Sequence, residues 1–174
     1  MIDLVKVTKD IISIDTTAPP GLNYKEAIDY LEPLFKQLGC DTQKISIPPQ
    51  YAEGNNDRWS LLAHKRHPGK PRLILYGHID VVPAEGWDAF IPREESGKIF
   101  GRGAADMKGA ITAILLGIQE VKEKSPITIV LTAYASIPNC VASMRAGAWD
   151  YLEKTPEDVG RAAARDDAER ESRT

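Results

Sequence analysis

One histidine and two aspartates stand where the sequence could build a metal site. His78 and Asp80 come at the end of a stretch that begins with the short apolar run 73–76, typical of a buried strand. Because alternate residues of an extended chain point to the same face, both side chains are expected on one side of the strand end. Asp106 stands in the glycine-rich stretch 101–109, just before a helical pattern. One imidazole and two carboxylates near strand ends are the raw material of a metal site.

Two alternatives bear on this interpretation. Asp106 could instead be the N-terminal cap of the helix that follows, because a helix dipole favours a carboxylate there. The ligand role is preferred because the histidine motif accompanies it. His64 and His67 lie in or beside the turn-like stretch 65–69. Nothing acidic is paired with them, so they are interpreted as residues of a solvated turn.

The spacing of apolar residues predicts the helices and strands that hold these three residues in place. Helical periodicity predicts two helices before the first strand, with Gly39 as the C-terminal cap of the second and Pro33 as a kink or break in it. The run 73–82 is predicted to be the central strand. The predicted helices are 3–14, 24–38 and 111–124. The predicted strands are 42–47, 59–64, 73–82 and 127–133.

Composition narrows the function classes. The chain has 174 residues, a hydrophobic content of 43% and a net charge of −3. This length suits one domain, and this charge gives no reason to expect a nucleic-acid partner or an anionic membrane. No apolar segment is long enough to span a bilayer, and the N-terminus lacks the order of a signal peptide. Two distant cysteines argue against a disulfide framework, so we expect a cytoplasmic protein.

Three segments carry a resemblance to a known family: GHIDVVP at 77–83, GWDAFIP at 86–92 and GKIFGRGAADMKG at 97–109. In this order they resemble the aminoacylase family of di-zinc amidohydrolases, which includes acetylornithine deacetylase, succinyl-diaminopimelate desuccinylase and carboxypeptidase G. The likeness extends from the N-terminus to about Lys124. It implies an α/β fold, a three-layer αβα sandwich with a mostly parallel sheet.

The same resemblance implies the chemistry. His78 would ligate one zinc and Asp106 would bridge two, with cobalt as a possible substitute. Asp80, counted with the catalytic residues, would hydrogen-bond the other nitrogen of His78 and fix its tautomer. The reaction would be hydrolysis of the amide bond of a small N-acyl amino acid or peptide by zinc-activated water.

The family pattern stops after the strand predicted at 127–133. An acidic pair should follow there, to supply the general base and a zinc ligand, but the sequence has Tyr134-Ala135-Ser136. The metal is therefore expected to be held weakly. Residues 129–136 and 142–154 instead resemble the last third of a response-regulator receiver domain. In that family Thr132 would contact the phosphoryl group and Lys154 would pair with the phosphorylated aspartate, but the half that carries this aspartate is absent, so both residues are interpreted as structural.

These observations predict a truncated or chimeric chain. Residues 1–124 would form the N-terminal part of a di-zinc amidohydrolase-type catalytic domain, 125–156 a receiver-like β-α-β continuation, and 157–174 a charged tail that is a frayed helix or disordered. The favoured function is that of a zinc-dependent amidohydrolase-like catalytic part, which we expect to be inactive alone. Because its site is incomplete, whether the chain is an enzyme stays an open question at this point. The alternatives are a non-catalytic recombined α/β domain and a receiver-like interaction module. A homo-oligomer could cover the exposed sheet edge.

Overall fold

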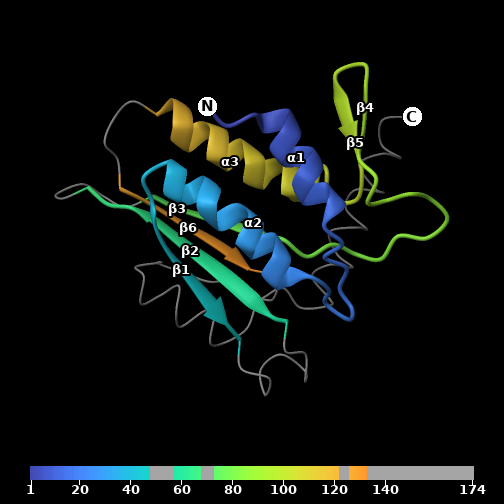
Figure 1. The fold of residues 1–174 in the computed structure, drawn as a ribbon, viewed down its shortest axis with the longest axis horizontal. Helices are drawn as coiled ribbons and strands as arrows, with labels where there is room; N and C mark the ends of the chain where they lie inside the picture. Colours follow the sequence, from blue (N-terminus) through green and yellow to red (C-terminus); the bar gives the residue numbers. More distant parts are fainter. Residues whose placement is uncertain (48–56, 68–72, 122–125, 133–174) are drawn as a thin grey trace, which may run out of the picture.

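The computed structural model describes residues 1–47, 57–67, 73–121 and 126–132 (Figure 1). The helices in this part of the chain are α1 (Leu4–Ser13), α2 (Tyr24–Gln37) and α3 (Lys108–Glu120). The strands are β1 (Asp41–Ser46), β2 (Trp59–Lys65), β3 (Leu73–His78), β4 (Arg93–Glu95), β5 (Lys98–Phe100) and β6 (Ile127–Thr132).

The main sheet has four strands in the order β1-β2-β6-β3. The β1–β2 and β2–β6 pairs are antiparallel, whereas β3 and β6 are parallel. The α/β class is confirmed, and the prediction of a mostly parallel sheet is corrected to a mixed sheet in the described residues. The reason lies in the connections. A crossover through α3 brings β6 back parallel to β3, whereas no described helix lies between β1 and β2 or between β2 and β3.

The strand predicted to be central is also corrected. β3 ends at His78, short of the predicted Val82, and within the described residues it pairs with β6 alone. β6 is an interior strand, as is β2, and all six residues of β6 are buried. A continuous hydrophobic run that is covered on both faces is typical of such a strand.

The three helices cover one face of the sheet in the described part of the chain (Figure 1). One hydrophobic core joins apolar side chains of all three helices to Ile127, Ile129 and Leu131 of β6. Thr128, Val130 and Thr132 on the opposite face of β6 are buried too. The part of the receiver-like β-α-β continuation beyond Thr132 and the tail 157–174 lie outside the described residues.

Pro33 neither kinks α2 into two helices nor ends it. The helix runs without interruption from Tyr24 to Gln37 with Pro33 inside it. A proline cannot donate to the carbonyl one turn earlier, so the helix loses one hydrogen bond at this point. The buried face of α2, which includes Leu31 and Phe35, packs in the core and holds the helix together.

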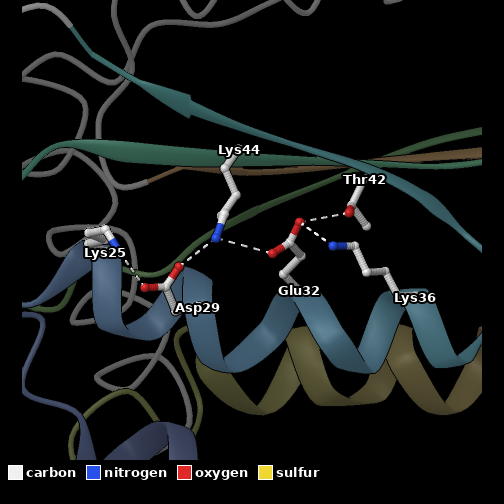
Figure 2. A network of polar contacts seen from close by, with 6 residues as sticks. All are labelled: Lys25, Asp29, Glu32, Lys36, Thr42 and Lys44. Carbon is white, nitrogen blue, oxygen red and sulfur yellow. Dashed lines mark hydrogen bonds and ion pairs between the residues drawn. The ribbon is translucent and has the colours of Figure 1, made fainter.

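Charged side chains tie α2 to the outer strand β1 (Figure 2). The Lys44 ammonium of β1 lies 2.8 Å from Asp29 and 3.2 Å from Glu32 on α2, and Lys36 lies 2.9 Å from Glu32. The Thr42 hydroxyl donates to Glu32 across 2.9 Å. The hydrogen bond from Lys36, together with those from Thr42 and Lys44, lowers the pKa of Glu32 to about 2, although partial desolvation opposes this shift. A strand that pairs on one side alone in the described residues is thereby held against the helical layer.

The described helices are all too short or too polar to cross a membrane.

Candidate metal centre

His78 and Asp80 project from the carboxyl end of β3, as alternation along an extended chain requires. The residue between them, Ile79, is fully buried, and its backbone N–H donates to the Thr132 carbonyl of β6 across 3.1 Å. Its carbonyl accepts a hydrogen bond from the buried Thr16 hydroxyl at 2.5 Å. With Ile79 anchored from both sides, His78 and Asp80 are directed away from the core together.

Residues 16–18, which follow α1, pair with the chain just after β3. Thr17 forms an isolated parallel bridge with Val81. Val81 donates to the Thr16 carbonyl across 3.1 Å, and Ala18 donates to the Val81 carbonyl across 2.9 Å. These backbone contacts place a short extended segment beside Asp80. The sequence analysis did not identify Thr16, because the partners of an isolated threonine cannot be read from the sequence around it.

Asp106 lies in the turns that precede α3. Its carboxylate Oδ1 lies 3.0 Å from Nε2 of His78. The N-cap position of α3 is occupied by Met107, whose side chain makes no capping hydrogen bond. Asp106 is therefore directed at the histidine rather than at the helix N-terminus. The peptide bond between Asp106 and Met107 is cis.

Asp80 contacts the other ring nitrogen of His78. Nδ1 of His78 lies 3.1 Å from the Asp80 backbone carbonyl and 3.4 Å from the Asp80 carboxylate. The two Asp80 oxygens can accept a hydrogen bond from Nδ1, and Asp106 Oδ1 can accept one from Nε2. A metal ion between His78 and Asp106 would take the place of a proton on Nε2 and leave the ring proton on Nδ1. The imidazole is largely buried, with 12% of the side chain exposed, whereas 84% of the Asp106 side chain is exposed. Of the two candidate metal ligands, His78 is therefore shielded and Asp106 faces solvent.

The structure therefore brings together all three residues singled out in the sequence. In the part of the chain that the structure describes, no group of three or more His, Cys, Asp and Glu side chains is arranged to hold a metal ion. Two ligand atoms of a tetrahedral zinc, each about 2.0 Å from the ion, lie about 3.3 Å apart. The 3.0 Å between Nε2 and Oδ1 is close to that separation. The donor types and spacing fit one edge of a zinc site, and their number falls short of the three protein ligands usual for catalysis.

His64 lies at the other end of the sheet from this pair. It pairs in register with Thr128 at the start of β6, and its Nδ1 lies 3.1 Å from the Thr128 hydroxyl. His78 pairs with Thr132, four positions further along β6 and thus about 13 Å away at 3.3 Å per residue. His64 is a strand residue rather than a turn residue, and it does not reach the His78 site.

A buried tyrosine and arginine lie behind the site. The Tyr24 side chain at the start of α2 is fully buried, and the Arg58 guanidinium lies 5.3 Å from its ring centroid. Burial raises the pKa of the Tyr24 hydroxyl, and the negative charge of Asp80 raises it further. Tyr24 therefore stays protonated at neutral pH. Tyr24 begins the helix predicted over 24–38, and nothing in the sequence connects it with the site.

The loop after Asp80 is ordered by the glycine-rich segment. The Arg102 backbone N–H donates to the Ala89 carbonyl across 2.7 Å, and its guanidinium donates to the Pro83 carbonyl across 3.3 Å. The same guanidinium lies 5.7 Å from the Trp87 ring centroid, a cation–π arrangement. The aromatic loop that contains Trp87 is thus bound to the segment that carries Asp106.

Lys108 is the least expected residue of the centre. It begins α3, two residues after Asp106, and its side chain is fully buried. Its ammonium donates to the Ile14 carbonyl across 2.7 Å and lies 5.8 Å from the Phe90 ring centroid. Burial lowers the pKa of Lys108 to about 8, although the charge of Asp15 opposes this shift.

The fold and the sequence similarities of this chain are those of part of a metallo-amidohydrolase-like catalytic domain. Residues 74–136 match the model of Peptidase family M20/M25/M40, a segment that contains His78, Asp80, Asp106 and β6. The resemblance to the amidohydrolase family is thereby confirmed.

Known proteins with similar sequences or structures agree with this classification. The chain is 38% identical over 113 residues to a succinyl-diaminopimelate desuccinylase of Rickettsia typhi, an alignment that covers 62% of this chain and 28% of the relative. It is 30% identical over 128 residues to an N-formyl-4-amino-5-aminomethyl-2-methylpyrimidine deformylase of Bacillus subtilis, covering 71% of this chain and 29% of the relative. The structure of human carnosine dipeptidase 1 superposes with a TM-score of 0.64 at 24% identity, over 75% of this chain and 31% of that one. The chain thus spans less than a third of the length of each.

Proposed function

We propose that His78 and Asp106 are the ligands of a zinc site of the amidohydrolase type, with cobalt as a substitute. The observation that carries this proposal is the 3.0 Å approach of His78 Nε2 to Asp106 Oδ1, with Nδ1 of His78 held by the Asp80 carbonyl at 3.1 Å. Asp106 would hold the metal together with His78. Asp80 would act as a positioning residue, because an acceptor at Nδ1 keeps the Nε2 lone pair available and raises its basicity.

The chemistry that zinc supplies in such sites is polarisation of a carbonyl and activation of a water molecule. The chain's own residues would hold the imidazole in one tautomer, present an exposed carboxylate, and close one side of the site with the loop that Arg102 binds. The substrates would be small N-acyl amino acids or peptides, in keeping with the names of the relatives, a desuccinylase and a dipeptidase. A desuccinylase and a deformylase among them leave the acyl group open.

Residues 1–174 alone are proposed to bind metal weakly and to lack turnover. Two described donors are fewer than a catalytic zinc requires, and the position of the family's acidic pair is occupied by Tyr134-Ala135-Ser136. Loss of a positioned general acid–base lowers a rate by about 10²–10⁴.

The test has two measurements on the purified chain and its His78→Ala variant. Calorimetric titration with Co²⁺ should show weak binding that the variant loses and that a strong chelator reverses. Amine release from N-acetyl and N-succinyl amino acids, with zinc or cobalt added, should stay at background for both proteins. Equal Co²⁺ binding by chain and variant would refute the assignment of the ligands. A robust hydrolysis rate that disappears in the variant would show that a complete site exists.

The proposed setting is the cytoplasm, since Cys40 is a buried free thiol and burial raises its pKa. Homo-oligomers that cover the outer strands of the sheet are also proposed, because β1 and β3 each pair on one side within the described residues. Light scattering at several protein concentrations would test this, and a monomer throughout the range would exclude it.

A further inference from the structure

Lys108 carries a positive charge into the core between α1 and α3. Its side chain is fully buried, and its ammonium donates to the Ile14 carbonyl across 2.7 Å. Ile14 is the C-cap residue of α1, so the ammonium meets the negative end of that helix dipole. A buried charge is costly unless it is hydrogen-bonded and compensated. The C-terminus of α1 and the neighbouring Asp15 supply this compensation.

The same lysine also forms one end of the loop that bears Asp106. The Lys108 backbone N–H donates to the Gly103 carbonyl across 2.8 Å, so Gly103 and Lys108 form the two ends of the loop. Gly103 has a φ of +84°, and a Cβ added there would lie 3.0 Å from Cδ of Lys108 and 2.8 Å from a methyl group of Val81. The aliphatic part of Lys108 therefore packs directly against the Gly103 backbone. Both ends of the loop depend on where this side chain lies.

Asp106 itself is poorly anchored by packing. Its side chain is 84% exposed, and its carboxylate contacts His78 across 3.0 Å. Its position must come from the loop ends rather than from its own surroundings. We propose that Lys108 is a positioning residue, whose hydrogen bond to the Ile14 carbonyl at the end of α1 holds the Asp106 carboxylate against Nε2 of His78. This inference rests on the proposed metal site, because it concerns how one ligand of that site is held.

The competing interpretation is that Lys108 only stabilises the fold. Replacement would then lower stability and leave the His78–Asp106 contact in the folded protein unchanged. A positioning role predicts a change in that contact among molecules that are still folded. The two roles are separated by a signal from His78 itself.

The experiment uses the full chain with Lys108→Met, which keeps the aliphatic length and removes the donor, and Lys108→Arg, which keeps a charged donor. Lys98→Met is the matched control, because Lys98 lies exposed on β5. The first readout is the NMR signal of the His78 ring nitrogens in metal-free protein. The chain has three histidines, so the loss of one signal set in His78→Gln assigns it. Asp106→Asn provides the signal expected when the carboxylate contact is lost.

The second readout is Co²⁺ affinity by calorimetry. Lys108→Met should move the Nε2 signal of His78 toward its position in Asp106→Asn. It should also weaken Co²⁺ binding about 10–100-fold, the range for residues that orient metal ligands. Lys108→Arg and Lys98→Met should keep the signal and the affinity of the unmodified chain. Circular dichroism on each variant establishes that folded molecules are compared.

An unchanged His78 signal in folded Lys108→Met would overturn the inference, whatever happens to stability. Failure of the unmodified chain to bind Co²⁺ would refute the proposed metal function, and the His78 signal would still decide the role of Lys108. If Lys108→Met does not fold, Lys108→Gln takes its place. Its uncharged amide reaches less far toward Ile14, so the same shift in the His78 signal is required of it.

Discussion

Glu32 offers a prediction that can be worked out from the network joining α2 to β1. Its carboxylate accepts from Thr42 and forms ion pairs with Lys36 and Lys44 (Figure 2). The pKa of Glu32 falls from 4.5 to about 2 in the folded chain. At 1.36 kcal/mol per pKa unit this corresponds to an upper bound of about 3 kcal/mol. Because 57% of the Lys36 side chain and 34% of the Lys44 side chain are exposed, solvent screening reduces the expected contribution to about 1 kcal/mol.

Glu32→Gln should therefore lower the free energy of unfolding by about 1 kcal/mol near neutral pH. The folded-state pKa lies below the unfolded value, so this stabilisation is complete above pH 4.5 and is lost as the pH falls toward 2. The difference between the original chain and the variant should shrink over the same interval. High salt should also reduce it, since the lysines are partly exposed.

The assay is urea unfolding followed by circular dichroism at neutral pH, at intermediate acid pH and at about pH 2.5, where most of the linkage is lost. Glu26→Gln is the matched control, because Glu26 is an exposed glutamate in the first turn of the same helix. Its removal should cost a few tenths of a kcal/mol, through the helix dipole. A cost for Glu32→Gln that stays constant across this pH range, or that equals the cost of Glu26→Gln, would refute the reasoning.

Three further predictions concern the core and the site. Ile129→Ala removes a fully buried side chain from β6 and should cost about 2–5 kcal/mol of unfolding free energy, measured in urea; a cost below 1 kcal/mol would mean that β6 is not interior. Gly109→Ala would place a Cβ 2.2 Å from the Ala104 carbonyl oxygen, so it should lower stability by about 1–3 kcal/mol and also weaken Co²⁺ binding; unchanged thermal unfolding would contradict this packing. Asp106→Asn should weaken Co²⁺ binding at least as much as Lys108→Met while unfolding within about 0.5 kcal/mol of the original chain, because Asp106 lies on the surface; retained affinity would remove it from the ligand set.

Apolar spacing is a local property, so the sequence alone places several helices and strands correctly, although α3 begins and ends earlier than the predicted 111–124 and β4 and β5 were not predicted. The predicted helix at 3–14 is α1 and the predicted strand at 42–47 is β1, each to within a residue. Gly39 has a φ of +76° directly after the C-cap residue of α2, as a helix-ending glycine requires. Two features were set by tertiary packing instead. The direction of β2 relative to β6 depends on how distant strands pair, and Pro33 stays within α2 because the face around Leu31 and Phe35 is buried.

The sequence also determined that His78 and Asp80 share one side of a strand end, since alternation is built into an extended chain. The tertiary structure decided the rest of the candidate site. The 3.0 Å between His78 and Asp106 arises where the loop before α3 packs beside the end of β3. The buried Lys108 ammonium donates its hydrogen bond to Ile14 at the end of α1, a residue 94 positions earlier in the sequence. A lysine in a sequence predicts a solvated side chain, and only a carbonyl brought to it by folding can hold its charge in the core.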